Sequence, residues 1–195
     1  MGLTFLKFVR RTQTHFVEAK GILSSSNGMN IYRGCTHCDS RSKCYGFTHE
    51  FEDIEVKTNA PQLLEQALKS KRKKCMIGTG AMCDPYLHAE EELKLTRRCL
   101  KLIDKYEYGV AIQTKSTRIL RDLDILKSIN AKAKTVVQMT MTTYDLPSPD
   151  HDLLMDIFRK RCAENGIIYD VNECFQYLHV FPEKYVQMSF VDNLQ

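Results

Sequence analysis

The sequence predicts an α/β fold in which parallel strands alternate with helices. Three short apolar segments, residues 75–80, 109–113 and 135–140, have the length and composition of buried strands. A longer segment with helical spacing of apolar residues precedes each of them. Strand and helix in alternation are typical of a parallel sheet with helices packed outside it, as in an open or closed α/β barrel. With 195 residues, the chain is long enough for one such domain.

The elements before the first buried strand follow from local signals. Residues 29–45 show neither helical nor alternating periodicity, which predicts irregular backbone. Residues 51–59 (FEDIEVKTN) alternate apolar and charged positions around Ile54 and Val56, which predicts a short strand. Residues 60–71 have a proline at an early position and leucines on one face, so a helix is expected there.

Two further helices are predicted at residues 87–106 and 121–130. Glu90–Glu92 are expected at the start of the first of these, where acidic side chains favour the helix dipole. The pattern changes after Thr143: a proline-bearing turn leads to predicted helices at 153–165 and 173–179. The parallel sheet should therefore contain about four strands. The chain divides into a partial barrel, residues 1–143, and a helical C-terminal segment, residues 144–195, packed on it.

Apolar runs, cysteine content and net charge limit the classes of protein to which the chain can belong. No segment resembles a secretory signal, and no apolar run approaches the roughly 20 residues that cross a membrane, which predicts a cytoplasmic protein with no membrane partner. Eight cysteines in a reducing compartment indicate metal binding or redox chemistry rather than disulfides. The net charge of +4 does not by itself indicate a nucleic-acid partner.

The strongest chemical signal is a cluster of cysteine and histidine in the irregular segment. Cys35, His37, Cys38 and Cys44 fall within ten positions of one another. Thiolates suit zinc and iron–sulfur clusters, and irregular backbone can turn several of them toward one centre. Unrelated reduced thiols are the alternative interpretation of the same spacing.

Three longer phrases carry a resemblance to a known family. They are residues 27–45 (NGMNIYRGCTHCDSRSKCY), 59–86 (NAPQLLEQALKSKRKKCMIGTGAMCDPY) and 110–126 (VAIQTKSTRILRDLDIL). Together they resemble the radical S-adenosylmethionine proteins of the spore photoproduct lyase-like group. The resemblance implies a shortened partial (β/α) barrel of the radical SAM type. It also implies a 4Fe–4S cluster held by three cysteines in the pattern CxxxCxxC, with S-adenosylmethionine (SAM) on the fourth iron.

The activity that the resemblance implies is lyase-like. An external electron donor reduces the cluster, SAM is cleaved to a 5′-deoxyadenosyl radical, and the radical abstracts hydrogen from a substrate. For this group the substrate would be DNA, which makes nucleic acid an expected partner.

The sequence departs from the family pattern in two places. RGCTH and CDSRS match on either side of the motif and make Cys35 and Cys38 the first and third cluster ligands. Only two residues separate these cysteines, where the motif needs six, so the middle cysteine is absent. Cys44 is a candidate replacement. Residues 148–184 resemble the closing segment of the group yet follow Thr143 almost directly, so two strands of the usual six are missing.

The resemblance also implies the SAM contacts. Gly78, Thr79 and Gly80, followed by Asp84, match a glycine-rich segment at the end of the second strand, where the backbone must approach the ligand closely. Thr114, Lys115 and Ser116, at the end of the next strand, would reach the ribose or carboxylate; a capped turn with one solvated lysine is the alternative. Cys83 lies near the place where the lyase has its hydrogen-donating cysteine.

Two other functions stay open at this point. A shortened, non-catalytic variant would bind no iron and would expose the sheet edge left by the missing strands, which would need a partner to cover it. A structural zinc site could use Cys35, His37, Cys38 and Cys44, because these are zinc ligands by type.

Overall fold

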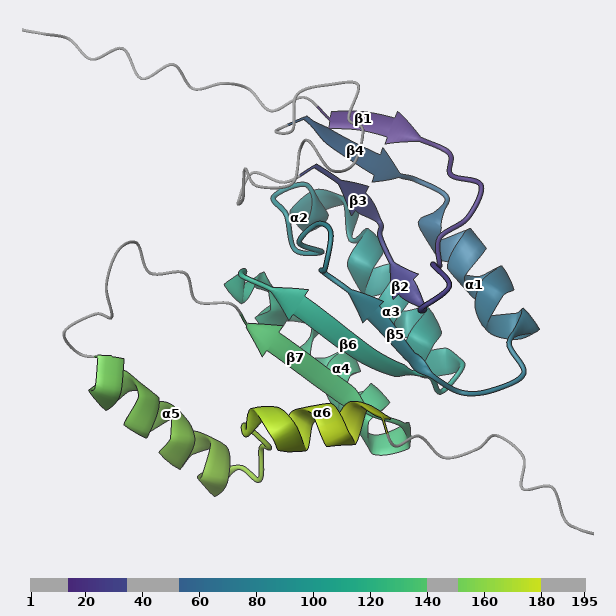
Figure 1. Cartoon of the computed structure of the whole chain (residues 1–195). Helices are drawn as coiled ribbons and strands as arrows, with labels where there is room; N and C mark the ends of the chain where they lie inside the picture. The colour runs from purple at the N-terminus through teal and green to yellow at the C-terminus, as the bar shows by residue number, and fades with distance from the viewer. Residues whose placement is uncertain (1–13, 35–52, 140–150, 180–195) are drawn as a thin grey trace, which may run out of the picture.

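The computed structural model describes residues 14–34, 53–139 and 151–179, which form a mixed α/β molecule (Figure 1). Its centre is a four-stranded sheet in the order β2-β5-β6-β7, and each neighbouring pair of strands is parallel. The strands are β2 (Gly28–Met29), β5 (Met76–Thr79), β6 (Gly109–Thr114) and β7 (Thr135–Met139). The predicted α/β class and the parallel arrangement are confirmed, whereas the described strands form open sheets and show no barrel.

A second, three-stranded sheet has the order β1-β4-β3. Its strands are β1 (Thr14–Val17), β4 (Ile54–Lys57) and β3 (Tyr32–Arg33), with β1 parallel and β3 antiparallel to β4. The predicted strand around Ile54 and Val56 is therefore present but lies outside the four-stranded sheet. The physical reason is its alternation: only Ile54 and Val56 are buried, whereas a strand inside a parallel sheet is covered on both faces.

The prediction of irregular backbone from residue 29 onward is wrong for its first residues. Met29 pairs with Thr79 in the parallel sheet, and Tyr32 and Arg33 pair with β4. These strands have two residues each, too few for a period of two to be visible in the sequence. Non-local pairing holds them, and a local pattern cannot report such pairing.

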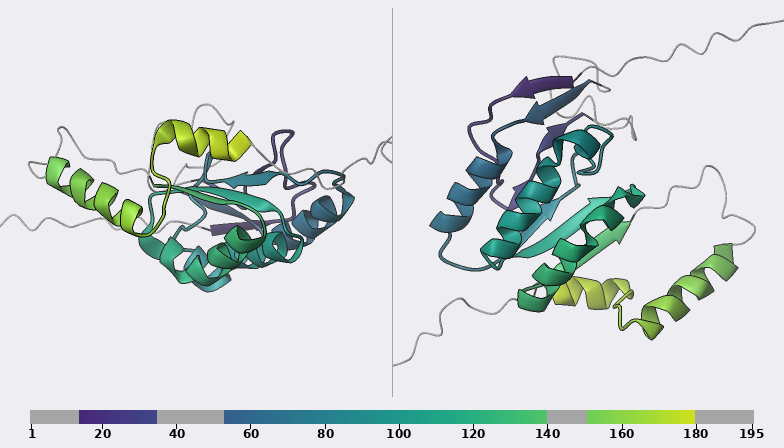
Figure 2. Two further views of the ribbon diagram at one scale, coloured as in Figure 1. Left: turned by 90° about the horizontal axis from the view of Figure 1, so that it is seen from below. Right: turned by 180° about the vertical axis from the view of Figure 1, so that it is seen from behind.

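Three helices cover one face of the parallel sheet: α1 (Ala60–Ser70), α3 (Leu95–Lys105) and α4 (Leu123–Lys132) (Figure 2). Their apolar faces and the sheet form the core, in which Leu64, Ile77, Leu100, Ile103, Val110 and Ile129 are fully buried. The predicted first helix, residues 60–71, is confirmed to within one residue, with Pro61 in its first turn.

The predicted helix at 87–106 is broken in two. α2 (Glu90–Leu93) is followed by Lys94, whose φ of 50° is left-handed. α3 then begins at Leu95. The break lets the buried Glu90 carboxylate accept hydrogen bonds from the backbone N–H groups of Thr96 (2.9 Å) and Arg97 (3.3 Å). Glu90 therefore caps α3 instead of lying exposed in the first turn of one continuous helix.

The C-terminal helices are α5 (His151–Glu164) and α6 (Val171–His179), within two residues of the predicted boundaries. Seen from below, the sheet lies between α6 on one side and the α3 and α4 layer on the other (Figure 2, left). The Lys134 ammonium ties α6 to the start of β7 by donating to the Tyr177 carbonyl over 2.7 Å. The predicted division at Thr143 falls outside the described residues. No helix in the described ranges is long and apolar enough to cross a membrane.

Candidate functional site

The carboxyl ends of β5 and β6 bring two of the predicted SAM-binding segments together. Thr79 pairs with Ile112, so Gly78–Gly80 and Thr114–Ser116 leave adjacent strands at the same edge of the sheet. Gly80 has a φ of +101°, and a Cβ built on it would lie 1.8 Å from the Gln113 carbonyl oxygen. Glycine is therefore required at position 80, because any side chain would push the two strand ends apart.

Asp84 joins the segment after β5 to the end of β6. Its buried carboxylate accepts hydrogen bonds from the Thr114 hydroxyl (2.8 Å), the Lys115 N–H (2.8 Å) and the Tyr86 N–H (2.9 Å). Both carboxylate oxygens are engaged within the chain. Asp84 thus fixes the geometry of this edge, a role that acts through its neighbours.

The three residues after β6 have different surroundings. The Thr114 hydroxyl donates to Asp84 and accepts from the Ser116 N–H (3.0 Å). Ser116 caps the following 3-10 helix (Thr117–Asp122) by accepting from the Arg118 N–H (3.3 Å). The side chain of Lys115 is exposed. Lys115 is therefore the residue of this group that offers a charge to a bound molecule, and the predicted capped turn is also present.

Cys83 lies at the point where the cysteine segment begins. Its buried thiol donates a hydrogen bond to the Gly34 carbonyl over 2.6 Å, and Gly34 directly precedes Cys35 in the chain. A second contact joins the same two segments, since the Asn30 side-chain N–H donates to the Met82 sulfur over 3.1 Å. The segment after β5 is thereby attached to the residues that lead into the cysteine segment.

The predicted metal ligands Cys35, Cys38 and Cys44 lie outside the described residues, as does His37. Among residues 14–34, 53–139 and 151–179, no three His, Cys, Asp or Glu side chains gather as a metal ion would require. The described part of the chain contributes Cys83, whose thiol contacts Gly34, the residue before Cys35 in the sequence.

A buried charged network supports this edge from the helix side, and the sequence did not reveal it. Glu90 has no exposed surface, and its carboxylate accepts from the Tyr32 hydroxyl and from the Arg121 guanidinium (2.7 Å). Burial, and then the charge of Glu90, raise the pKa of Tyr32, which keeps the hydroxyl a donor. Tyr32 stands two residues before Gly34, so the network anchors the approach to the cysteine segment.

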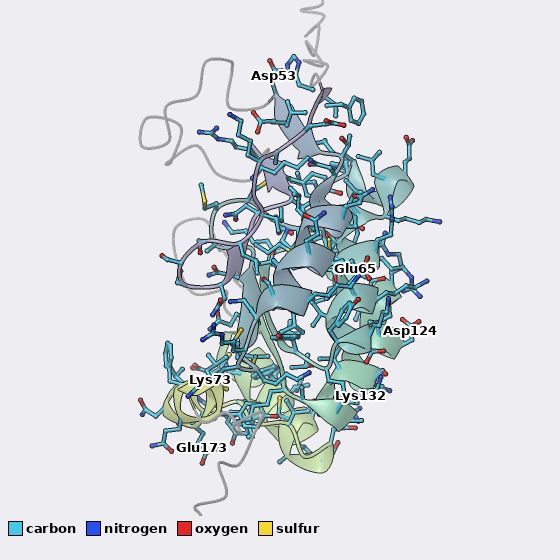
Figure 3. All side chains as sticks on the ribbon, turned by 90° about the vertical axis from the view of Figure 1, so that its right-hand side faces the viewer. Asp53, Glu65, Lys73, Asp124, Lys132 and Glu173 are labelled. Carbon is cyan, nitrogen blue, oxygen red and sulfur yellow. The ribbon has the colours of Figure 1, made fainter. Side chains whose placement is uncertain are left out.

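The network continues outward from the 3-10 helix and α3 to the first turn of α4. Arg121 also bonds Asp122 (3.0 Å), and Arg97 bridges the buried Asp122 (2.6 Å) to the exposed Asp124 (2.7 Å). Asp124 marks its outer end on the helix layer (Figure 3). In the sequence, Glu90 is indistinguishable from the two glutamates that follow it, and only its burial sets it apart.

Comparisons with known proteins give relatives but no activity. An uncharacterized protein of Methanocaldococcus jannaschii is 35% identical over 153 residues, which are 71% of this chain and 56% of the relative. An uncharacterized protein of Mycobacterium tuberculosis is 26% identical over 161 residues, 74% of this chain and 45% of the relative. The chain spans about half the length of the curated relatives it matches. No family model and no solved structure matches it.

Proposed function

We propose that this chain is a radical SAM protein in which the carboxyl edge of the parallel sheet binds SAM and the segment beginning at Cys35 binds a 4Fe–4S cluster. The observation that carries the proposal is the hydrogen bond between Cys83 and Gly34. It connects the segment after β5, which holds the proposed SAM contacts, with the start of the cysteine segment. This contact supports the proposal because Gly34 directly precedes Cys35 in the sequence.

Two features of the described residues suit a ligand with a carboxylate. Gly78 has open space where a side chain would stand, so a ligand can approach the backbone of β5 there, whereas the same space at Gly80 is filled by the Gln113 backbone. Lys115 offers an exposed ammonium at the same edge, where α/β sheets bind ligands. Asp84, Thr114 and Ser116 hold that edge in place through their mutual hydrogen bonds.

The cluster requires three thiolates in the proposed mechanism. Cys35 and Cys38 are two of them by the resemblance, and the third is Cys44 or Cys83. The contact with Gly34 places the Cys83 thiol beside the residue that precedes Cys35, which supports Cys83 as a candidate. When bound, the reduced cluster supplies one electron that cleaves the SAM sulfonium into methionine and a 5′-deoxyadenosyl radical. The electron comes from an external donor.

The experiment that tests the proposal is metal analysis after anaerobic purification and reconstitution with iron and sulfide. We expect about four irons per chain and broad absorption near 400 nm, as for a thiolate-held cluster. Reduction in the presence of SAM should then release 5′-deoxyadenosine. One tightly held zinc and no iron would favour the zinc site, and no metal at all would favour a shortened, non-catalytic variant.

Variants identify the ligands. Cys35→Ser and Cys38→Ser should each abolish the 400 nm absorption. Cys44→Ser and Cys83→Ser separate the two candidates for the third ligand, because only the true ligand loses iron on substitution. Cys75→Ser is the matched control: Cys75 precedes β5 at the opposite end of the strand, so its replacement should leave iron content unchanged.

A further inference from the structure

β7 is one of the two edge strands of the parallel sheet. The strand order ends at β7, and among the residues that the structure describes no strand lies beyond it (Figure 1). The Val110 N–H donates to the Lys134 carbonyl over 2.8 Å, which fixes the phase of the ladder. In a parallel pair of strands, the backbone N–H and C=O groups of every second residue face the neighbouring strand. Those of Val136 and Gln138 therefore point to β6. Those of Thr135, Val137 and Met139 point away from β6.

Among the described residues, one of the outward N–H groups has a partner. The Thr135 N–H donates to the Asn130 side chain over 3.2 Å. The N–H groups of Val137 and Met139 and the carbonyls of all three outward residues are directed to the outside of the sheet. This row of donors and acceptors is a template for a further strand.

The sequence of β7 carries no charge and no proline that would protect an edge strand. Exposed edges commonly carry charged residues, proline or a bulge, or are very short. β7 has five residues, Thr135–Met139, without charge or proline, whereas the opposite edge strand, β2, has two. Its apolar Val137 and Met139 are 41% and 52% exposed and share one face. The chain has a net charge of +4, so two copies repel each other where charged surfaces meet. Contact through the uncharged β7 edge places no like charges opposite each other.

We propose that β7 pairs antiparallel with β7 of a second copy of this chain, which gives a continuous eight-stranded sheet. With the two-fold axis at Val137, the two Val137 residues exchange both of their hydrogen bonds, and each Met139 N–H donates to Thr135 of the other copy. The pairing thus satisfies four outward N–H groups across the dimer. Such a contact is isologous and closes at two copies.

α6 completes this interface. A stable interface buries about 800 Å² per partner, more than two five-residue strands supply. α6 lies over one face of the sheet beside β7, and an axis normal to the sheet brings both copies of α6 to that same face (Figure 2, left). Val171 and Phe175, one helical turn apart on α6, are 65% and 51% exposed, and they supply apolar surface for this contact.

Handedness argues against one alternative, a strand placed directly after α6 that pairs with β7 in parallel. Tyr177 near the end of α6 contacts Lys134, which precedes β7, so a strand that followed α6 directly would run parallel to β7. Its crossover would pass over the α6 face, opposite to the crossovers through α3 and α4, and so would have the opposite hand. Parallel crossovers share one hand in about 98% of cases. A second copy meets no such restriction.

The test is the molar mass of the full chain by light scattering and sedimentation at about 10–100 μM. We expect twice the chain mass for the unmodified protein and the single chain mass for Val137→Pro. Proline at this position removes only an outward N–H, so the β6–β7 bonds and the folded circular dichroism should persist. Met139→Lys is the second variant and should also halve the mass. Its control, Phe16→Lys on β1, changes an exposed apolar residue of the other sheet and should remain dimeric.

A crosslink tests the register. Val137→Cys should form an intermolecular disulfide under mild oxidation, because the Cα atoms of a hydrogen-bonded antiparallel pair lie about 5.5 Å apart. Lys101→Cys, on the exposed side of α3, should not. A monomeric unmodified chain would overturn the proposal and point to a different polypeptide at this edge. A dimer that persists in both Val137→Pro and Met139→Lys would also overturn the proposal. So would a molar mass that keeps rising with concentration beyond that of two chains.

Discussion

The Asp84 carboxylate accepts a 2.8 Å hydrogen bond from the Thr114 hydroxyl, which ties the segment after β5 to the end of β6. The two residues are 30 positions apart in the chain, and both are buried. The bond makes the geometry of the proposed SAM site depend on a carboxylate that need not touch the ligand.

Asp84→Asn should therefore lower the free energy of unfolding by about 1–3 kcal/mol, because an amide N–H replaces one acceptor and leaves a buried N–H without a partner. Thr114→Val should have an effect in the same direction, and Thr114→Ser, which keeps the hydroxyl, should be close to neutral. Urea denaturation measures all three. Combining Asp84→Asn with Thr114→Val should cost less than the sum of the single changes, and strict additivity would show that the two side chains do not cooperate.

Gly80→Ala tests the close approach of β5 and β6. The new Cβ would lie 1.8 Å from the Gln113 carbonyl oxygen on a backbone with φ of +101°. We expect a loss of roughly 2–4 kcal/mol in the free energy of unfolding. Gly78→Ala is the matched control, since its Cβ meets no atom within 4 Å, and it should change stability little. Equal effects of the two substitutions would contradict this account.

The Tyr32–Glu90 contact should couple the second sheet to the helix layer. Glu90→Ala removes one of the two buried carboxylates that Arg121 contacts, the acceptor of the Tyr32 hydroxyl and the cap of α3, and should cost about 3–5 kcal/mol. Tyr32→Phe should cost less, about 1–2 kcal/mol, because the carboxylate keeps its bonds from Arg121 and Thr96. A double-mutant cycle with thermal unfolding measures the coupling. A coupling energy near zero would mean that the hydroxyl contributes nothing to stability.

Acid should weaken the contact between α1 and α3. Glu65 on α1 accepts from the Tyr106 hydroxyl (2.6 Å) and the Lys105 ammonium (3.0 Å), and these bonds lower the pKa of Glu65 from 4.5 to about 2 (Figure 3 shows Glu65). A lowered folded-state pKa gives stability that is complete above the unfolded value and disappears as pH falls from about 4.5 to 2.

Glu65→Gln should accordingly flatten the stability profile in this pH range, measured by urea unfolding between pH 2 and 6. Tyr106→Phe removes the largest cause of the shift and should move the acid loss to higher pH, with the carboxylate retained. An unchanged slope in Glu65→Gln would show that other carboxylates govern the acid response.

The helices and the central strands were predictable because their signals are local. α1 and α4 follow from leucine and isoleucine spacing, and β5, β6 and β7 from short apolar runs between helices. β1, β2 and β3 were not predicted: β2 and β3 have only two residues each, and all three strands pair with distant segments. The break at Lys94 was missed for a related reason: it depends on where the Glu90 side chain finds its partners.

The candidate site divides in the same way. Gly80, Asp84 and Thr114–Ser116 were singled out from the sequence, and the parallel register of β5 and β6 does bring them to one edge. Their roles could not be predicted, because the sequence does not distinguish an aspartate that accepts three internal hydrogen bonds from one that binds a ligand. Cys83 was identified by resemblance, whereas its contact with Gly34 became known only from the fold.

The sequence by itself determined the alternation of strands and helices and the residue types at the sheet edge, because apolar periodicity and glycine are properties of short segments. Only the tertiary structure decided which strands share a sheet, that Asp84 and Glu90 are buried and bonded, and that β7 is the last described strand of its sheet. Each of these depends on contacts between residues far apart in the chain. Such contacts are selected by the packing of the whole core rather than by any local pattern.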